Sequence, residues 1–357
     1  MEVFLADLIQ EQRRQGLDVH ALVHGDPLPD DPVWLQRVPV QFSVIYAPIA
    51  LGFRRALAQA IQRIQPDVLH LHMPNNSVFW TLTLAQARDI PWVVHWHSDV
   101  VVSRIRTAVA IAYRLYRPFE QAVLSQAARV IATSTPYLEA SEPLRTWRDK
   151  CDVVPLGLDC TNPAPPDDTE PLKSWSAEDG GALRLLSIGR LTYYKGFETL
   201  VRAVTGQPGL ELLISGEGES RQELETLIAT QTRSGEPPNV RLLGNVGDNE
   251  KHALLQSCDV FCLASCERTE AFGMVLLEAM HHARPCIVSD LPGSGMPWVV
   301  SKADAGLRVP PEDGISGWRA AFQHLQAQPE QRAAFGAAGQ RALLEYFSIA
   351  ACAKALA

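Results

Sequence analysis

Short apolar segments alternate with amphipathic segments through the second half of this chain of 357 residues. The apolar segments have the length of buried strands, and the segments between them repeat apolar residues at helical spacing. Such alternation is typical of a doubly wound parallel sheet with helices on both faces. The predicted strands are 183–188, 210–215, 240–243, 259–263, 285–289 and 306–309, and the predicted helices lie near 195–204, 220–233, 249–257 and 273–283.

The first half repeats this alternation more loosely, so a second α/β domain is expected there. With 46% apolar residues, a chain of this length can bury two cores. We expect an N-terminal domain at 1–160, a linker rich in proline, aspartate, serine and glycine at 161–181, a second domain at 182–335 and a helical segment at 336–357. The predicted N-terminal strands are 19–23, 68–72, 92–96 and 130–132, and the helices lie near 3–15, 50–64, 78–88 and 102–127.

Composition excludes several classes of protein. The net charge is −8 and no concentrated basic face is visible, so nucleic-acid binding is not expected. No apolar run approaches eighteen residues, and acidic residues interrupt the N-terminal segment, so neither a transmembrane helix nor a signal peptide is predicted. Seven cysteines without CxxC spacing indicate a reducing, cytoplasmic compartment. Cys258, Cys262 and Cys266 straddle a predicted strand, so they are not expected to bind metal.

Two carboxylates, Glu270 and Glu278, stand eight residues apart around an apolar run. If the helix begins near Gly273, their backbones are about 12 Å apart and free N–H groups at the helix start could hold a diphosphate. Glu270 could instead merely favour the helix N-terminus, and Glu278 could be a solvated helix position. Apolar neighbours surround Glu278, however, which predicts a buried helix in which an unpaired carboxylate would be costly. We therefore predict a ligand site.

Two cations follow the first predicted strand of the second domain. Arg190 leaves the carboxyl end of that strand, where open parallel sheets bind ligands, and Lys195 opens the next helix. Fixed cations there could stabilise a departing diphosphate, although a solvated loop would also explain them. Glycines at other strand ends could approach the phosphates or a base through the backbone, or serve only turn geometry. These are Gly216, Gly244, Gly293 and Gly295.

Four histidines and a basic helix mark the first domain. His70 and His72 are expected on one face of a strand, and His95 and His97 on one face of another. A zinc site would need the two pairs to converge, but pairs at strand ends rarely do, so no metal is predicted. The segment 101–117 contains several arginines among apolar residues. It could dock on an anionic membrane, although an ordinary surface helix is the favoured interpretation. The arginines are Arg104, Arg106, Arg114 and Arg117.

The segment 265–273 and the spacing of Glu270 and Glu278 resemble the E-x7-E motif of retaining GT-B glycosyltransferases of family 4, the glycosyltransferase group 1 family, particularly bacterial members that build surface polysaccharides. The resemblance spans nearly the whole chain and is strongest over 183–300. It implies two Rossmann-like domains facing across a cleft, with the last helix returning to the first domain. It also implies a metal-independent enzyme of the hexosyltransferase type, with no cofactor besides a nucleotide-sugar co-substrate.

The resemblance also assigns roles to individual residues. Arg190 and Lys195 would hold the diphosphate. Glu270 would contact the donor sugar and Glu278 the ribose. The remaining matches are His97 beside the reacting carbon, and Phe272 and Gly273 in the donor site. His72 and Asp99 are expected on the acceptor side, although both could instead be satisfied structural residues. The acceptor would be a glycan or a lipid-linked molecule, reached in the cytoplasm or at the inner face of the membrane.

The chain departs from the family pattern at its N-terminus. Family members usually open with a strand and a glycine-rich loop, whereas residues 1–8 already have a helical pattern. We therefore predict that the usual first strand is missing. Two other functions stay open: a non-catalytic nucleotide-sugar-binding protein, impaired by the missing strand, and a nucleotide-sugar epimerase, which would need no acceptor.

Overall fold

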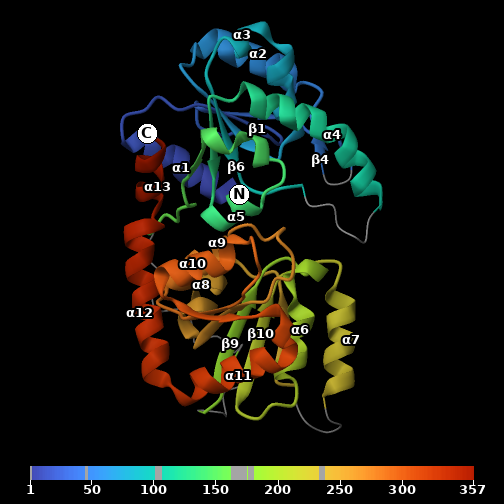
Figure 1. The fold of residues 1–357 in the computed structure, drawn as a ribbon, viewed down its shortest axis with the longest axis vertical. Helices are drawn as coiled ribbons and strands as arrows, with labels where there is room; N and C mark the ends of the chain where they lie inside the picture. Colours follow the sequence, from blue (N-terminus) through green and yellow to red (C-terminus); the bar gives the residue numbers. More distant parts are fainter. Residues whose placement is uncertain (1, 45–46, 101–106, 162–174, 176–180, 233–237) are drawn as a thin grey trace. The chain divides into compact units, whose positions relative to one another are not determined.

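The computed structural model describes residues 2–44, 47–100, 107–161, 175, 181–232 and 238–357 (Figure 1). The chain divides into two compact units, residues 1–155 and 156–355. Most of the predicted linker, 161–181, lies outside the described residues. Within it, the Trp175 indole Nε1 donates a hydrogen bond of 2.8 Å to the Ser257 hydroxyl, so this side chain packs on the second unit.

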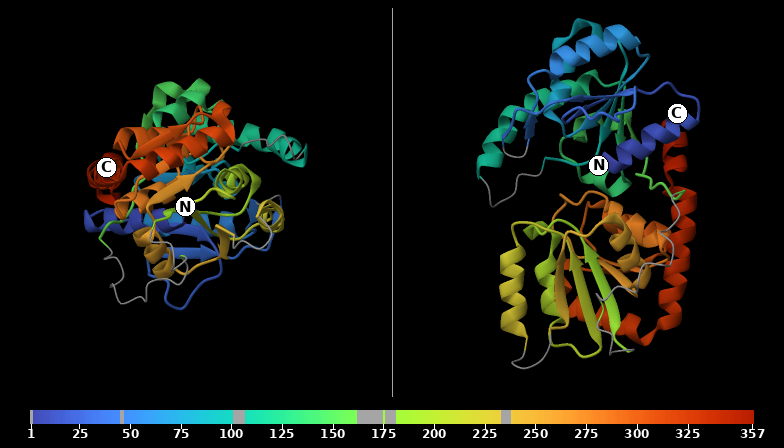
Figure 2. Two further views of the ribbon diagram at one scale, coloured as in Figure 1. Left: turned by 90° about the horizontal axis from the view of Figure 1, so that it is seen from below. Right: turned by 180° about the vertical axis from the view of Figure 1, so that it is seen from behind.

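The second unit contains one six-stranded sheet in the order β11-β10-β9-β12-β13-β14, in which every pairing is parallel (Figure 1; Figure 2, right). The predicted alternation of strands and helices is confirmed. Three strands coincide with their predicted ranges, and the other three differ by one residue. The strands are β9 (Leu183–Ile188), β10 (Leu210–Ser215), β11 (Val240–Gly244), β12 (Val260–Leu263), β13 (Cys286–Ser289) and β14 (Gly306–Val309).

Helices cover both faces of this sheet. On one face, Phe197, Trp318 and Phe322 of α6 and α11 pack against alternate strand residues such as Leu185 and Leu212. Burying each such side chain contributes about 1.5–3 kcal/mol. On the other face α9 and α10 contact the strands from β12 to β14, and α12 packs on both helices. The helices are α6 (Phe197–Val204), α7 (Arg221–Gln231), α8 (Asp248–Ser257), α9 (Met274–His281), α10 (Gly295–Ala303), α11 (Gly314–Ala327), α12 (Pro329–Tyr346) and α13 (Ile349–Leu356), with short 3-10 turns at Tyr193–Lys195 and Pro311–Asp313.

Helix α10 was not predicted, because its first residues resemble a turn. Ser294 accepts a hydrogen bond from the Met296 N–H and so caps the helix. Pro297 lies in the first turn, where its missing N–H costs no intrahelical bond. The glycine and proline therefore begin a helix here instead of interrupting one.

The first unit holds a parallel sheet in the order β5-β6-β7-β8, a separate parallel pair β1-β2 and an antiparallel pair β3-β4. Strands β1, β5, β6 and β7 were predicted, whereas β2, β3, β4 and β8 were not. The strands are β1 (Ala21–His24), β2 (Leu35–Val38), β3 (Phe42–Val44), β4 (Ala47–Ile49), β5 (Leu69–Met73), β6 (Trp92–Trp96), β7 (Arg129–Ala132) and β8 (Cys151–Val153).

The helix predicted near 78–88 is wrong in detail, since a 3-10 segment η1 (Asn76–Thr83) and a short α3 (Ala85–Arg88) replace it. Thr81 and Thr83 hydroxyls donate to the carbonyl groups three residues earlier, which competes with a regular helix. Leu84 is extended and separates the two pieces. The other helical segments are α1 (Glu2–Arg14), α2 (Phe53–Ile64), α4 (Thr107–Gln126), α5 (Thr135–Ala140) and η2 (Arg145–Lys150). Among the described residues, no helix is long and apolar enough to cross a bilayer.

Candidate functional site

The strand order of the second unit reverses at β9. Strand β10 follows β9 along the chain and lies on one side of it, whereas β12 lies on the other side. Open parallel sheets bind ligands at the carboxyl ends of the strands at such a switch point. The loop after β9 carries Lys195 and the loop after β12 carries Glu270. Two residues predicted from sequence therefore flank the point at which this fold offers a ligand site.

Lys195 and Glu270 form an ion pair through Nζ and Oε2. Their side chains are only 12% and 14% exposed. Removing one partner of such a pair would leave a poorly solvated charge, so each side chain holds the other in place. The lysine ammonium has three donors, and Glu270 uses one of them.

Backbone contacts join the two loops. Gly196 has a φ of 68°, and a Cβ atom there would lie 1.9 Å from the carbonyl oxygen of Ala264. Any other residue would therefore separate the loop from the end of β12. The N–H of Cys266 donates a hydrogen bond of 2.8 Å to the carbonyl group of Tyr194. The main chain thus fixes the spacing between Lys195 and the strand that leads to Glu270.

The start of α10 anchors the Glu270 loop from the other side. The Ser294 hydroxyl donates to the Glu270 carbonyl oxygen at 2.6 Å, and the Gly295 N–H donates to the Ala271 carbonyl oxygen at 2.8 Å. Arg268 Nε donates to the carbonyl oxygen of Gly293 at 3.0 Å. Gly293 and Gly295 therefore hold this loop in the structure, and their contact with donor phosphates stays a prediction.

The remaining motif residues begin α9. Gly273 is its N-cap residue with a φ of 82°, a conformation that favours glycine. The Phe272 side chain is 3% exposed and its ring lies edge-on to Phe347, with centroids 6.2 Å apart. Packing is therefore sufficient to explain the phenylalanine, whereas the glycine shapes the backbone between Glu270 and the helix.

Two further predicted glycines lie beside Arg190. A Cβ atom on Gly216 would lie 1.9 Å from the carbonyl oxygen of Gly189, and the Gly216 N–H donates to the carbonyl oxygen of Gly244 at 2.8 Å. The ends of β9, β10 and β11 are thus in close backbone contact. Arg190 follows Gly189 directly and its side chain is exposed.

Glu278 lies on α9 with its side chain 25% exposed, and Lys251 Nζ of α8 is 3.4 Å from its Oε1. The prediction that this helix is apolar and buried nearly all round is wrong on one side. One side of the helix is half-buried. It carries Met274, Val275 and Glu278, whose spacing places them on the same side. The predicted separation of about 12 Å assumed a helical rise per residue all the way from Glu270 to Glu278. Helix α9 begins only at Met274, so this rise does not apply between Glu270 and Met274.

The four histidines of the first unit share one face of the sheet. Register pairs His72 with His95, so the two histidine pairs lie together and not on separate faces. Ring centroids stand 4.4–5.4 Å apart in five of the pairings among them. The expectation that such pairs do not converge is therefore wrong. His97 is 5% exposed, and its Nε2 lies 2.8 Å from His72 Nδ1.

Asp99 is buried and has protein partners. Its Oδ1 accepts hydrogen bonds from Trp96 Nε1 at 2.9 Å and from the Ser141 hydroxyl at 2.6 Å. Its backbone N–H donates to the Tyr137 hydroxyl at 2.6 Å. These contacts favour the alternative that Asp99 is a satisfied structural residue joining β6 to the segment after β7.

Comparison with known proteins gives the family. The family model for "Glycosyl transferases group 1" matches residues 168–342, and that for "Glycosyl transferase 4-like domain" matches residues 1–157. A D-rhamnosyltransferase, WbpZ of Pseudomonas aeruginosa, is 30% identical over 94% of this chain and 85% of its own length. The chain belongs to the glycosyl transferase group 1 family. The O-antigen chain mannosyltransferase C of Escherichia coli is 28% identical over 76% of this chain and 68% of its own.

Solved structures agree on the fold of this glycosyltransferase. Sucrose-phosphate synthase from Thermosynechococcus elongatus has a TM-score of 0.78 at 23% identity, over 99% of this chain and 91% of that one. WaaG, a glycosyltransferase involved in lipopolysaccharide biosynthesis, has a TM-score of 0.66 at 14% identity, over 99% and 94%. The predicted GT-B fold is confirmed, as is the resemblance to group 1 enzymes of bacterial surface polysaccharide synthesis.

Sequence reasoning missed Lys251, the cation beside Glu278. Its own segment, a polar helix, gave no sign of a site, because only the tertiary contact between α8 and α9 brings it there. A second contact joins the same helices, since His252 Nδ1 lies 2.9 Å from His282 Nε2. Lys251 therefore belongs among the candidate site residues of the glycosyltransferase.

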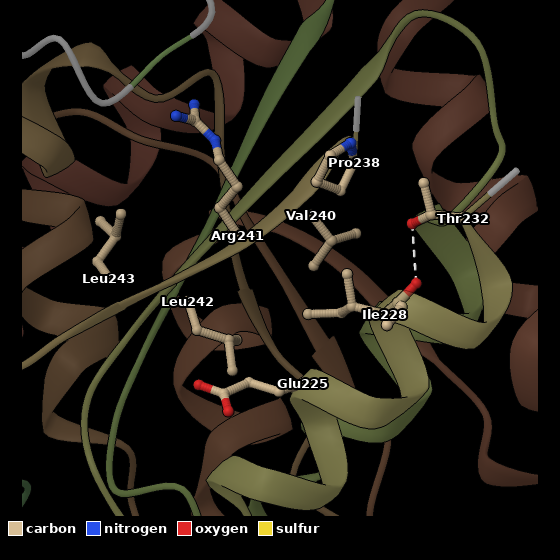
Figure 3. Close-up of a pocket in the computed structure, with 9 residues that line it drawn as sticks. Glu225, Ile228, Thr232, Pro238, Val240, Arg241, Leu242 and Leu243 are labelled. Carbon is tan, nitrogen blue, oxygen red and sulfur yellow. Dashed lines mark hydrogen bonds between the residues drawn. The ribbon is translucent and has the colours of Figure 1, made fainter. Parts of the chain in front are cut away.

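An open hollow of about 630 Å³ lies elsewhere in the second unit, between α7 and the edge strand β11 (Figure 3). Aliphatic side chains such as Ile228, Val240 and Leu242 line it, with Glu225 at its margin. None of the residues predicted to bind the donor lines this hollow. It is a gap between a helix and a strand, away from the switch point.

Proposed function

We propose that this glycosyltransferase transfers a hexose from a nucleotide-sugar donor with retention of configuration at the anomeric carbon and without a catalytic metal. The ion pair between Lys195 and Glu270 at the switch point carries the proposal. It combines a cation suited to a departing diphosphate with a carboxylate suited to sugar hydroxyls. A relative 27% identical over 94% of the chain is a GDP-mannose-dependent alpha-mannosyltransferase, which supports a donor of this class.

The ion pair indicates separate roles for its cation and its carboxylate in donor binding. The Lys195 ammonium donates one of its three hydrogen bonds to Glu270 and presents the other two N–H groups to the diphosphate. The ammonium then lies between the carboxylate and the phosphates, which reduces their repulsion. Arg190, from the same loop, adds a second cation. Together these fixed charges stabilise the leaving group, which is the usual work of a metal ion in such transfers.

The other predicted residues complete the donor site. Glu278 accepts hydrogen bonds from the ribose hydroxyls, with Lys251 holding its carboxylate. From its match to the family histidine, His97 would contact the donor sugar near the anomeric carbon. A donor phosphate oxygen takes the proton from the acceptor hydroxyl as the sugar is transferred, through an oxocarbenium-like transition state.

We also propose that the acceptor is lipid-linked. In the described part of α4, Ile111, Leu115 and Phe119 are 65%, 72% and 52% exposed. Their spacing of four places them on one face of the helix, beside the exposed Arg114. An exposed apolar face with a nearby cation suits docking on an anionic membrane. Arg104 and Arg106, which suggested docking from sequence, lie outside the described residues.

The test is a nucleotide-release assay with a panel of nucleotide sugars, with and without a lipid-linked acceptor, preceded by calorimetry to establish donor binding. We expect acceptor-dependent release, abolished by Glu270→Ala while nucleotide affinity is kept. Proton NMR of the product reports the anomeric configuration. Donor binding with no release under any condition would indicate a nucleotide-sugar-binding protein, and sugar interconversion without acceptor would indicate an epimerase. Turnover unchanged in Glu270→Ala would refute the assignment of that residue.

A further inference from the structure

Three histidines of the first unit lie close enough together to bind one metal ion. His70 and His72 project from β5, and His95 projects from the neighbouring strand β6 on the same face. One ring nitrogen from each lies within 4.8 Å of the others. His95 is fully buried, whereas His70 and His72 are half-buried.

These rings contain buried nitrogens that no protein group satisfies. His70 Nε2 and both His95 Nδ1 and Nε2 are buried without a hydrogen-bond partner. Buried polar atoms in folded proteins are nearly always paired, so three such atoms in one cluster need an explanation. A metal ion accepts one lone pair from each imidazole, so it would pair Nε2 of His70 and one of the two nitrogens of His95.

His97 is placed to orient one of the three rings. Its Nε2 lies 2.8 Å from His72 Nδ1. If Nδ1 of His72 carries the proton and donates it, Nε2 of His72 is left with its lone pair for a ligand. Metal-bound histidines commonly donate their other N–H in this way, which fixes the tautomer and the ring orientation.

An aromatic side chain packs against one side of the cluster. Phe4 packs edge-on against His95 and His97 and shields that side from water.

We propose that His70, His72 and His95 bind a divalent first-row transition metal, represented by Zn²⁺, and that His97 positions His72. A ligand set made only of imidazoles favours zinc, copper or nickel over magnesium or calcium. Zinc–nitrogen bonds are about 2.0–2.1 Å long, so the stacked rings must rotate to bring their nitrogens together. The ion would tie β5 to β6 in the first unit, which goes beyond the donor chemistry proposed above.

The test uses the full chain without a polyhistidine tag, stripped with chelator and titrated with Zn²⁺ by calorimetry and with Co²⁺ by visible absorption. We expect one equivalent to bind, and Zn²⁺ to raise the melting temperature. Zn²⁺ affinity should fall at least tenfold in His70→Ala and in His72→Ala, and by about 10–100-fold in His97→Gln. His20→Ala is the control, because it removes a histidine of the same unit that lies outside the cluster and has a side chain 27% exposed.

Circular dichroism and nucleotide binding show whether each variant is folded. His70 is half-buried, so His70→Ala serves where a change at His95 would unfold the unit. No saturable Zn²⁺ binding by the stripped wild-type protein would overturn the proposal. Equal Zn²⁺ affinity in folded His70→Ala and His20→Ala would do the same, and would leave the cluster as a stack of histidine rings.

Discussion

The buried ion pair at the switch point can be tested by separating its contribution to stability from its contribution to turnover. Glu270→Gln and Lys195→Met each remove one charge and leave the other with little solvent. Breaking a fully buried pair costs about 3–5 kcal/mol, and the residual exposure of 12% and 14% reduces the expected loss to about 2–3 kcal/mol. The double variant removes both charges, so most of this loss should be recovered.

The kcat of the double variant should not recover together with its free energy of unfolding. If Lys195 stabilises the departing diphosphate, its loss lowers kcat by about 10²–10³, as removing one donor to a developing charge does in other enzymes. The double variant should therefore be stable and still inactive. Urea unfolding and nucleotide release measure the two quantities, and Glu198→Gln is the control because its pair with Arg202 is exposed and should contribute below about 0.5 kcal/mol. A stable double variant with kcat within fivefold of wild type would show that the pair is only structural.

Three further outcomes are expected. Glu278→Gln should weaken binding of the nucleoside diphosphate by about 1–2 kcal/mol in calorimetry, through the lost charged hydrogen bonds to ribose; unchanged affinity would remove Glu278 from the site. Leu115→Glu combined with Phe119→Glu should abolish co-sedimentation with anionic vesicles while leaving turnover with a soluble acceptor intact, and undiminished sedimentation would refute docking through α4. Burial raises the pKa of Glu120 from 4.5 to about 7, so the folded protein holds this proton more tightly than the unfolded chain does. Wild type should therefore lose about 3 kcal/mol relative to Glu120→Gln as pH rises from 4.5 to 7. Parallel stability curves for the two proteins over that range would contradict this assignment.

Strand positions in the second unit were predictable because each strand is a short apolar run between polar turns. Strands β9, β10 and β14 coincide with their predicted ranges. Helix α10 was missed because Gly295 and Pro297 resemble a turn until the cap at Ser294 is seen. Local residue type thus predicts an element well, except where a capping contact decides it.

Candidate residues of the site could be named from the sequence, but the contacts between them could not. Lys195 and Glu270 were both identified, yet their ion pair joins residues 75 apart in the chain and depends on the strand order. Lys251 was missed for the same reason. The histidines were placed on separate faces because strand alternation says nothing about register, which pairs His72 with His95.

The backbone contacts that join the loops after β9 and β12 have a kinetic consequence. The close approach of Gly196 to Ala264 and the bonds from Ser294 and Gly295 hold the Glu270 loop before any donor arrives. Binding then requires little ordering of the main chain, so its entropic cost is low. Association should proceed at similar rates for different nucleotide sugars, and discrimination among them should lie in how long each stays bound.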